Sequence, residues 1–136
     1  MFFEQPPPGK RIVLFDDDPV YRSLMIRAAE LNGSKLDAYE SIDNIRPQDL
    51  VGKYDVVLLD YDLGHTTGPE IAAFLSEMCG DLPVLLISGV NRVDSKNKWP
   101  PAIQSFVLKS EGHQQALSAA VECTRRRLSC IVSQAY

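Results

Sequence analysis

The chain has 136 residues, a formal net charge of −4 at pH 7 and 45% hydrophobic residues. This is the length and composition of one compact domain that buries its own core, and its acidic balance is atypical of proteins that bind nucleic acid directly. The three cysteines (Cys79, Cys123 and Cys130) form no CxxC pair, and no stretch reaches the roughly 20 apolar residues of a membrane span, so we expect a cytoplasmic protein without a disulfide framework, zinc site or membrane insertion.

Five short apolar runs divide the sequence, at 12–15, 35–39, 56–59, 84–87 and 106–108. Continuous apolar runs of this length are typical of strands that are covered on both faces in a parallel sheet. We therefore predict one doubly wound α/β domain over residues 10–129, with a five-stranded parallel sheet flanked by helices. Residues 1–9, which are rich in proline, and residues 130–136 are interpreted as tails.

Helical spacing separates these runs. Asp18 is a suitable N-cap and Pro19 a suitable first residue for a helix at 19–31, whose apolar face we assign to Leu24, Ala28 and Leu31. A second helix is predicted at 69–79, with Ile71, Leu75 and Met78 on one face. A C-terminal helix carries an apolar stripe at Leu117, Val121, Thr124 and Leu128.

The segment from residue 91 to residue 105 breaks this pattern. It is mostly polar at its start and contains Pro100-Pro101, which a helix cannot run through. We therefore predict that the fourth helix is short or irregular. Trp99 in this segment could anchor a partner, but we favour packing against its own domain, because an indole ring supplies buried area to a loop with few other core residues.

Polar side chains follow four of the five runs. Asp16 and Asp17 follow the first run, Asp60 the third, Ser88 the fourth and Lys109 the fifth. Ligands of open α/β sheets bind beyond the carboxyl ends of the strands, where these side chains are expected to meet.

Three converging carboxylates need a counter-charge. Two like charges about 4 Å apart repel by about 4 kcal/mol at an effective dielectric constant near 20. Hard carboxylate oxygens without nearby His or Cys favour Mg²⁺ (or Mn²⁺), which also binds phosphoryl groups. Asp60 stands alone at its strand end and is the better candidate for a nucleophile that becomes an acyl phosphate, with Ser88 and Lys109 contacting the phosphoryl oxygens.

Taken in order, four stretches resemble the receiver domain of two-component response regulators: FDDDP at 15–19, DVVLLDYDLGHTTG at 55–68, VLLISG at 84–89 and FVLK at 106–109. Gly68, eight residues after Asp60, also falls where this family usually has glycine. The resemblance implies a flavodoxin-like receiver fold in which Asp60 accepts a phosphoryl group from a histidine kinase, a phosphotransfer protein or a small phosphodonor. It further implies a metal site formed by Asp16, Asp17, Asp60 and the backbone carbonyl of Tyr61.

The resemblance also implies roles around the phosphoacceptor. Ser88 and Phe106 would form the switch, and Asp62 would modulate hydrolysis of the phosphoryl group. Such a protein catalyses its own phosphotransfer and dephosphorylation but is not a conventional turnover enzyme. The family usually has proline after the lysine, whereas Ser110 follows Lys109 here, so we predict a trans peptide bond at this position.

The output is expected to be protein contact. No effector domain is recognisable after the last helix, so the sequence favours a stand-alone receiver in phosphorelay signalling. Its partners would be a histidine kinase or phosphotransfer protein and an unidentified downstream protein, with homodimerisation as another route.

Two other interpretations remain open at this stage. Asp16 and Asp18 also fit the first motif of haloacid-dehalogenase-like phosphatases, with Asp16 as nucleophile and Ser88 and Lys109 as later motifs. In that family an acidic pair should follow the lysine, but only Glu111 and Glu122 do so here, and Asp60 would have no role. The second alternative is a receiver-like binding module that works without phosphorylation.

Overall fold

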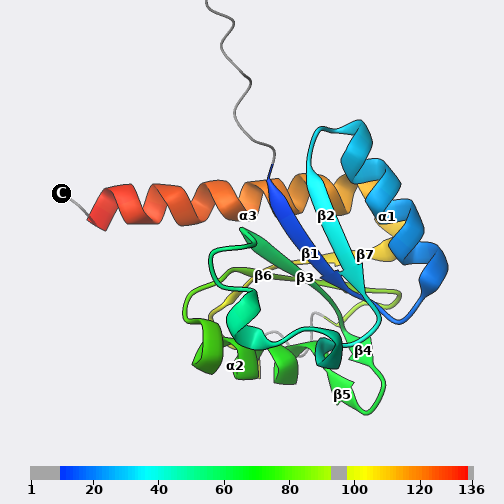
Figure 1. Cartoon of the computed structure of the whole chain (residues 1–136), viewed down its shortest axis with the longest axis horizontal. Helices are drawn as coiled ribbons and strands as arrows, with labels where there is room; N and C mark the ends of the chain where they lie inside the picture. Colours follow the sequence, from blue (N-terminus) through cyan, green and yellow to red (C-terminus); the bar gives the residue numbers. More distant parts are fainter. Residues whose placement is uncertain (1–9, 93–97, 135–136) are drawn as a thin grey trace, which may run out of the picture.

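The computed structural model describes residues 10–92 and 98–134, with side chains described as far as residue 123. Five parallel strands form one sheet in the order β2-β1-β3-β6-β7 (Figure 1). Their bounds are β1 Arg11–Phe15, β2 Lys35–Tyr39, β3 Val56–Asp60, β6 Val84–Ser88 and β7 Ile103–Leu108. The predicted five-stranded parallel sheet is therefore confirmed, and each strand contains one of the apolar runs.

Helices cover both faces of this sheet, and their bounds are α1 Pro19–Leu31, α2 Gly68–Cys79 and α3 His113–Gln134 (Figure 1). Ile12 and Leu14 of β1 pack with residues of α1 and α3, whereas Val13 and Phe15 pack with residues of α2. Successive strand residues point to opposite faces, so a sheet covered on both faces needs apolar residues at every position. This explains the continuous apolar runs.

Helix α1 begins as predicted but presents a different face to the sheet. The Asp18 side chain accepts the Val20 N–H at 2.9 Å, and Asn32 caps the other end. The buried face is centred on Met25, whereas Leu24 and Leu31 are 46% and 73% exposed, so the predicted stripe is wrong in these two members. At 100° per residue, Leu24 and Leu31 lie about 100° or more around the helix from Met25.

Helix α2 is confirmed, with its start one residue earlier than predicted. The Thr67 side chain accepts the Glu70 N–H at the N-terminus, and Gly80 follows the last residue with φ of 71°. Ile71 and Leu75 are buried as predicted, but Met78 is 53% exposed because it lies outside the face that meets the sheet.

The other connections are less regular. Between β2 and β3 the chain forms two short 3₁₀ turns, Ile42–Asn44 and Pro47–Asp49, in place of an α-helix. The segment is rich in Ser, Asp, Asn and Pro, which favour turns and caps over helix interiors. A small hairpin pairs β4 (Asp62–Leu63) with β5 (Thr66–Thr67) after β3.

The fourth helix is absent from the described residues between β6 and β7, which agrees with the prediction that it is short or irregular. Residues 93–97 lie outside the described part of the chain. Trp99 packs against the core cluster on the α2 face, as predicted. The described peptide bonds, including Lys109-Ser110, are all trans, which confirms that prediction as well.

Helix α3 is longer than expected. It continues to Gln134, past the predicted domain boundary at residue 129, and Figure 1 shows it extending beyond the sheet. Leu117 of the predicted stripe is buried, together with Ala116, Ala120 and Cys123. No helix in the described ranges is both long enough and apolar enough to cross a bilayer.

Candidate functional site

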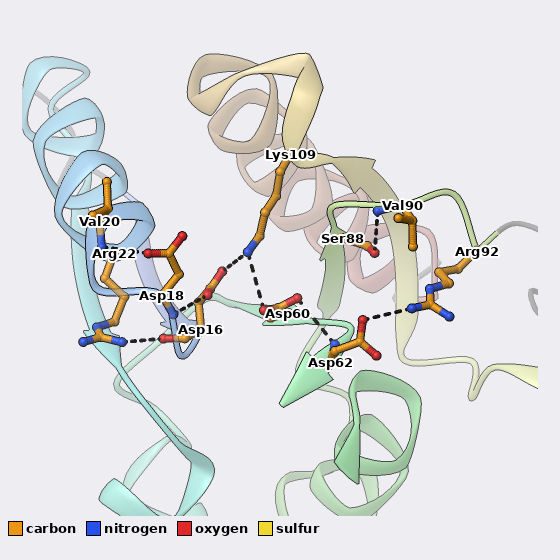
Figure 2. A network of polar contacts seen from close by, with 10 residues as sticks. All are labelled: Asp16, Asp18, Val20, Arg22, Asp60, Asp62, Ser88, Val90, Arg92 and Lys109. Carbon is orange, nitrogen blue, oxygen red and sulfur yellow. Dashed lines mark hydrogen bonds and ion pairs between the residues drawn. The ribbon is translucent and has the colours of Figure 1, made fainter. Parts of the chain in front are cut away.

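The carboxyl ends of four strands bring the predicted site residues together (Figure 2). Asp16 directly follows β1, Asp60 ends β3, Ser88 ends β6 and Lys109 directly follows β7. The side chains of Asp16, Asp60 and Ser88 are buried, although they carry polar groups. A buried polar group needs a partner or a ligand, so this edge of the sheet is the candidate site.

Three carboxylates meet at this edge. Asp16, Asp17 and Asp60 each offer an oxygen, and these atoms all lie within 4.8 Å of one another. Asp16 and Asp60 are buried, while Asp17 is exposed. The grouping comes from the ends of β1 and β3, which are paired side by side. A set of carboxylate oxygens without nitrogen or sulfur ligands suits a hard divalent cation such as Mg²⁺ or Ca²⁺.

Lys109 supplies the nearest positive charge. Its Nζ lies 2.7 Å from Oδ2 of Asp16 and 3.5 Å from Oδ2 of Asp60. Burial alone would lower the pKa of Lys109, but the hydrogen bond and charge of Asp16, followed by those of Asp60, raise the pKa overall. The ammonium therefore stays charged between the two buried carboxylates.

Asp60 holds its proton more tightly than an ordinary aspartate. Burial, followed by the charge of Asp16, raises the pKa of Asp60 from 3.8 to about 6, and Lys109 offsets part of this rise. Both causes disfavour a second anion in the pocket. The pocket therefore has the electrostatic character of a site that a cation completes.

The three consecutive aspartates at 16–18 have different structural roles. Asp16 turns back on its own loop, where its Oδ1 accepts the Asp18 N–H at 2.9 Å. Its backbone carbonyl accepts a hydrogen bond from Arg22 at 2.7 Å. Asp18 caps α1 and is not part of the three-carboxylate group.

Ser88 keeps its hydroxyl proton available. Its Oγ accepts the Val90 N–H at 3.1 Å, which uses a lone pair and leaves the O–H free to donate elsewhere. In the β3–β6 pairing, Asp60 lies opposite Ile87, so Ser88 is one position further along the neighbouring strand.

The Tyr61 carbonyl, expected to bind the metal, is already engaged. It accepts the Gly68 N–H at 2.7 Å, which directs it toward the start of α2. A Cβ on Gly68 would lie 2.7 Å from the end of the Leu86 side chain and 3.1 Å from the Asp60 carbonyl oxygen, so a larger residue here would have to displace both. The role of the Tyr61 carbonyl as a metal ligand stays a prediction.

Tyr21 of α1 is a neighbour of Lys109 that the sequence reasoning missed. The Lys109 Nζ lies 4.5 Å from the centre of the Tyr21 ring, which is buried. Burial, then the charges of Asp16 and Asp60, raise the pKa of Tyr21 to about 12, so the phenol stays neutral. Tyr21 lies three residues before Leu24 and seven before Ala28, so helical spacing would have extended the assigned stripe one turn back to include it.

Asp62 and Arg92 form a second charged pair beside the site (Figure 2). Arg92 Nη2 lies 2.9 Å from Oδ2 of Asp62, and the Asp62 N–H donates to Oδ1 of Asp60 at 3.4 Å. The Arg92 guanidinium also lies over the Tyr61 ring, 4.7 Å from its centre. Arg92 was not singled out from the sequence, because its partner Asp62 lies 30 positions earlier, in the β4–β5 hairpin.

A row of aromatic rings leads away from the site. Tyr61 lies 6.4 Å from Trp99, and Trp99 stacks on Phe106 with the ring centres 5.6 Å apart. Phe106, the predicted switch residue, is therefore linked through Trp99 to Tyr61, the residue after Asp60. Beside this row, a cavity of about 410 Å³ is lined by Trp99, Pro100, Pro101 and residues of β7.

Comparisons with known proteins agree with this architecture. No family model matches the chain. The chain is 31% identical over 129 residues to the probable transcriptional regulatory protein NarL of Mycobacterium tuberculosis, which covers 90% of this chain and 58% of NarL. It therefore spans less than two thirds of that relative.

Solved structures of response regulators are also similar to this chain. The signal receiver domain of the putative response regulator NarL from M. tuberculosis is 26% identical, with a TM-score of 0.68 over 88% of this chain and 98% of that chain. The response regulator TrrA from Thermotoga maritima, in complex with Mg²⁺-BeF, is 24% identical, with a TM-score of 0.70 over 84% and 98% of the two chains. The predicted resemblance to response-regulator receiver domains is therefore confirmed.

Proposed function

We propose that Asp60 accepts a phosphoryl group from a histidine kinase, a phosphotransfer protein or a small phosphodonor, and that this modification switches protein contacts in two-component signalling. The observation that carries the proposal is the grouping of Asp16, Asp17 and Asp60 within 4.8 Å, with the Lys109 ammonium beside two of them. That arrangement concentrates negative charge around one nucleophile and offers a site for a cation.

The metal site consists of the three carboxylates, which suit Mg²⁺ or Mn²⁺. When bound, the cation supplies charge neutralisation for the carboxylates and for the oxygens of the incoming phosphoryl group. The Tyr61 carbonyl accepts the Gly68 N–H with one lone pair and has a second, so we keep it as a proposed further ligand.

Asp60 is a better nucleophile than Asp16. Asp16 is fully buried, and its two oxygens are occupied by the Asp18 N–H and the Lys109 ammonium. Asp60 is slightly exposed, and its contacts at 3.4 Å and 3.5 Å are longer. Because its contacts are weak, the Asp60 carboxylate can turn toward a phosphodonor with little loss of stabilising interactions. This argues against the phosphatase alternative, in which Asp16 would be the nucleophile.

In the reaction, an oxygen of ionised Asp60 attacks the donor phosphorus. The bond from phosphorus to the leaving nitrogen or oxygen breaks, the leaving group takes the electron pair, and Asp60 becomes an acyl phosphate. The Lys109 ammonium would form an ion pair with the phosphoryl oxygens. The Ser88 hydroxyl would donate a hydrogen bond to one of them. Ser88 and Phe106 then form the proposed switch, with Trp99 between Phe106 and Tyr61.

The test is chemical labelling with a small phosphodonor. Acetyl phosphate and Mg²⁺ should add one phosphoryl group to the intact protein, measured by mass spectrometry, and borohydride trapping should locate it on Asp60. Asp60→Asn should abolish the addition. Labelling of Asp16 would instead support the phosphatase, and a protein that is never labelled but functions in cells would support the phosphorylation-independent module.

A further inference from the structure

Asp62 brings a fourth carboxylate to the phosphoacceptor. It is joined to Asp60 through its own backbone N–H, and its side chain is 64% exposed. Any phosphoryl group on Asp60 adds further negative charge to a neighbourhood that already holds Asp16 and Asp17. Lys109 cannot balance Asp62, because Lys109 is engaged with Asp16 and Asp60.

Arg92 provides the balancing charge from the opposite loop. Its Nη2 lies 2.9 Å from Oδ2 of Asp62, and Figure 2 shows the two side chains meeting beside Asp60. The guanidinium is held in place by the face of the Tyr61 ring, 4.7 Å away. Tyr61 and Asp62 directly follow Asp60, so Arg92 contacts both residues after the phosphoacceptor.

These contacts distinguish Arg92 from an ordinary surface cation. A lone exposed ion pair contributes little, whereas a guanidinium that also stacks on an aromatic ring is fixed in direction. Among the described side chains, the buried Nε of Arg92 has no hydrogen-bond partner. Its geometry is therefore set by Tyr61 and Asp62.

We propose that Arg92 is a positioning residue that neutralises Asp62 and so lets phosphoryl charge accumulate at Asp60. This inference rests on the proposed function of Asp60. Without Arg92, the free Asp62 carboxylate repels the incoming phosphoryl group, and phosphorylation slows. Arg92 acts on the phosphorylation rate only by neutralising Asp62, so the rate no longer depends on Arg92 once the charge of Asp62 is removed.

The experiment is a double-mutant cycle on the rate of phosphorylation by acetyl phosphate with saturating Mg²⁺. Arg92→Met keeps much of the apolar stem over Tyr61 and should slow the reaction by roughly three- to fivefold. Asp62→Asn should match or exceed the wild-type rate, and the double variant should lie within about twofold of Asp62→Asn. Arg92→Lys should recover part of the loss by restoring the charge.

A matched control comes from another exposed pair. Arg46 and Asp49 also lie 2.9 Å apart, in the 3₁₀ turn between β2 and β3, so Arg46→Met removes a similar ion pair without touching Tyr61 or Asp62. Its rate should match the wild type.

The outcomes separate this inference from the proposed function. A wild-type rate in Arg92→Met, with Asp60 still labelled, would overturn the role of Arg92 alone. A double variant as slow as Arg92→Met would also overturn it, because the loss would then be independent of Asp62. Failure of the wild-type protein to gain a phosphoryl group would refute the function on which the inference depends.

Discussion

The Nζ of Lys109 lies 2.7 Å from Oδ2 of Asp16, although the strands that precede them are not neighbours. Two strands, β3 and β6, separate β1 from β7 in the sheet, and the lysine side chain spans this distance over the end of β3. Asp60, the last residue of β3, has its Oδ2 3.5 Å from the same Lys109 nitrogen. The ion pair therefore holds the two sides of the site together above Asp60.

Replacing Lys109 by Met should destabilise the metal-free protein at neutral pH. The substitution leaves Asp16 buried without its cation, and breaking one partner of a buried pair typically costs about 3 kcal/mol or more. Mg²⁺ should recover part of the loss by replacing the lost charge. Urea unfolding of both proteins with EDTA and with Mg²⁺ measures this, and an unchanged free energy of unfolding in EDTA would contradict it.

The raised pKa of Asp60 should appear in the pH dependence of stability without metal. The pKa of about 6 exceeds the ordinary 3.8, so between these values the folded protein holds a proton that the unfolded chain has released. Protonation of Asp60 therefore adds its full contribution to the free energy of unfolding below pH 4. This contribution is lost as pH rises toward 6 and no longer changes above pH 6. Its full size is about 3 kcal/mol.

Asp60→Asn isolates this contribution from those of other carboxylates. The variant should gain stability over the wild type as pH rises from 4.5 to 7.5, measured by urea unfolding in EDTA. A constant difference across this range would show that Asp60 titrates normally.

Divalent metal should stabilise the wild-type protein at pH 7.5, and less so at lower pH. At a concentration 100 times its Kd, a ligand that binds only the folded state adds about 2.7 kcal/mol. Below pH 6, Asp60 takes up a proton and competes with the metal. Thermal unfolding with and without Mg²⁺ measures the shift.

The Asp17 carboxylate gives a structural control for the metal site, because it is exposed and should not matter for folding. Asp17→Ala should leave the melting temperature in EDTA nearly unchanged but weaken Mg²⁺ binding and slow phosphorylation. An equal Mg²⁺ shift in this variant would place the metal elsewhere.

Trp99 should report phosphorylation by its fluorescence. It is the single tryptophan of the chain, and it stacks on Phe106 and lies near Tyr61. If the Phe106 ring moves when Asp60 is modified, Mg²⁺ with beryllofluoride should change the Trp99 emission. Phe106→Leu should reduce the change, and an unaltered spectrum in the wild type would argue against Phe106 as the switch.

The chemical core of the site was predictable because it depends on local pattern. Asp16, Asp60, Ser88 and Lys109 each follow an apolar run, and parallel strands align those positions at one edge. Gly68 was recognised through its fixed spacing from Asp60. None of these inferences required knowing how far any side chain reaches.

The contacts that surround the core could not be read in this way. Arg92 lies in the irregular stretch after β6, beside the end of β3, and no periodic pattern predicts that its side chain meets Asp62. The predicted face of α1 was displaced because several apolar stripes are available, and only the packed structure shows that the buried one includes Tyr21 and Met25. The 3₁₀ turns between β2 and β3 likewise follow from turn residues that we had not weighed.

Gly68 has a consequence for genetics. A methyl group at this position would crowd the Leu86 side chain and the backbone carbonyl of Asp60. A screen for loss of signalling should therefore recover Gly68 substitutions alongside those in Asp60 itself, although glycine has no side chain to offer to phosphate or metal. Alleles of this kind would preserve every reactive group and still impair signalling.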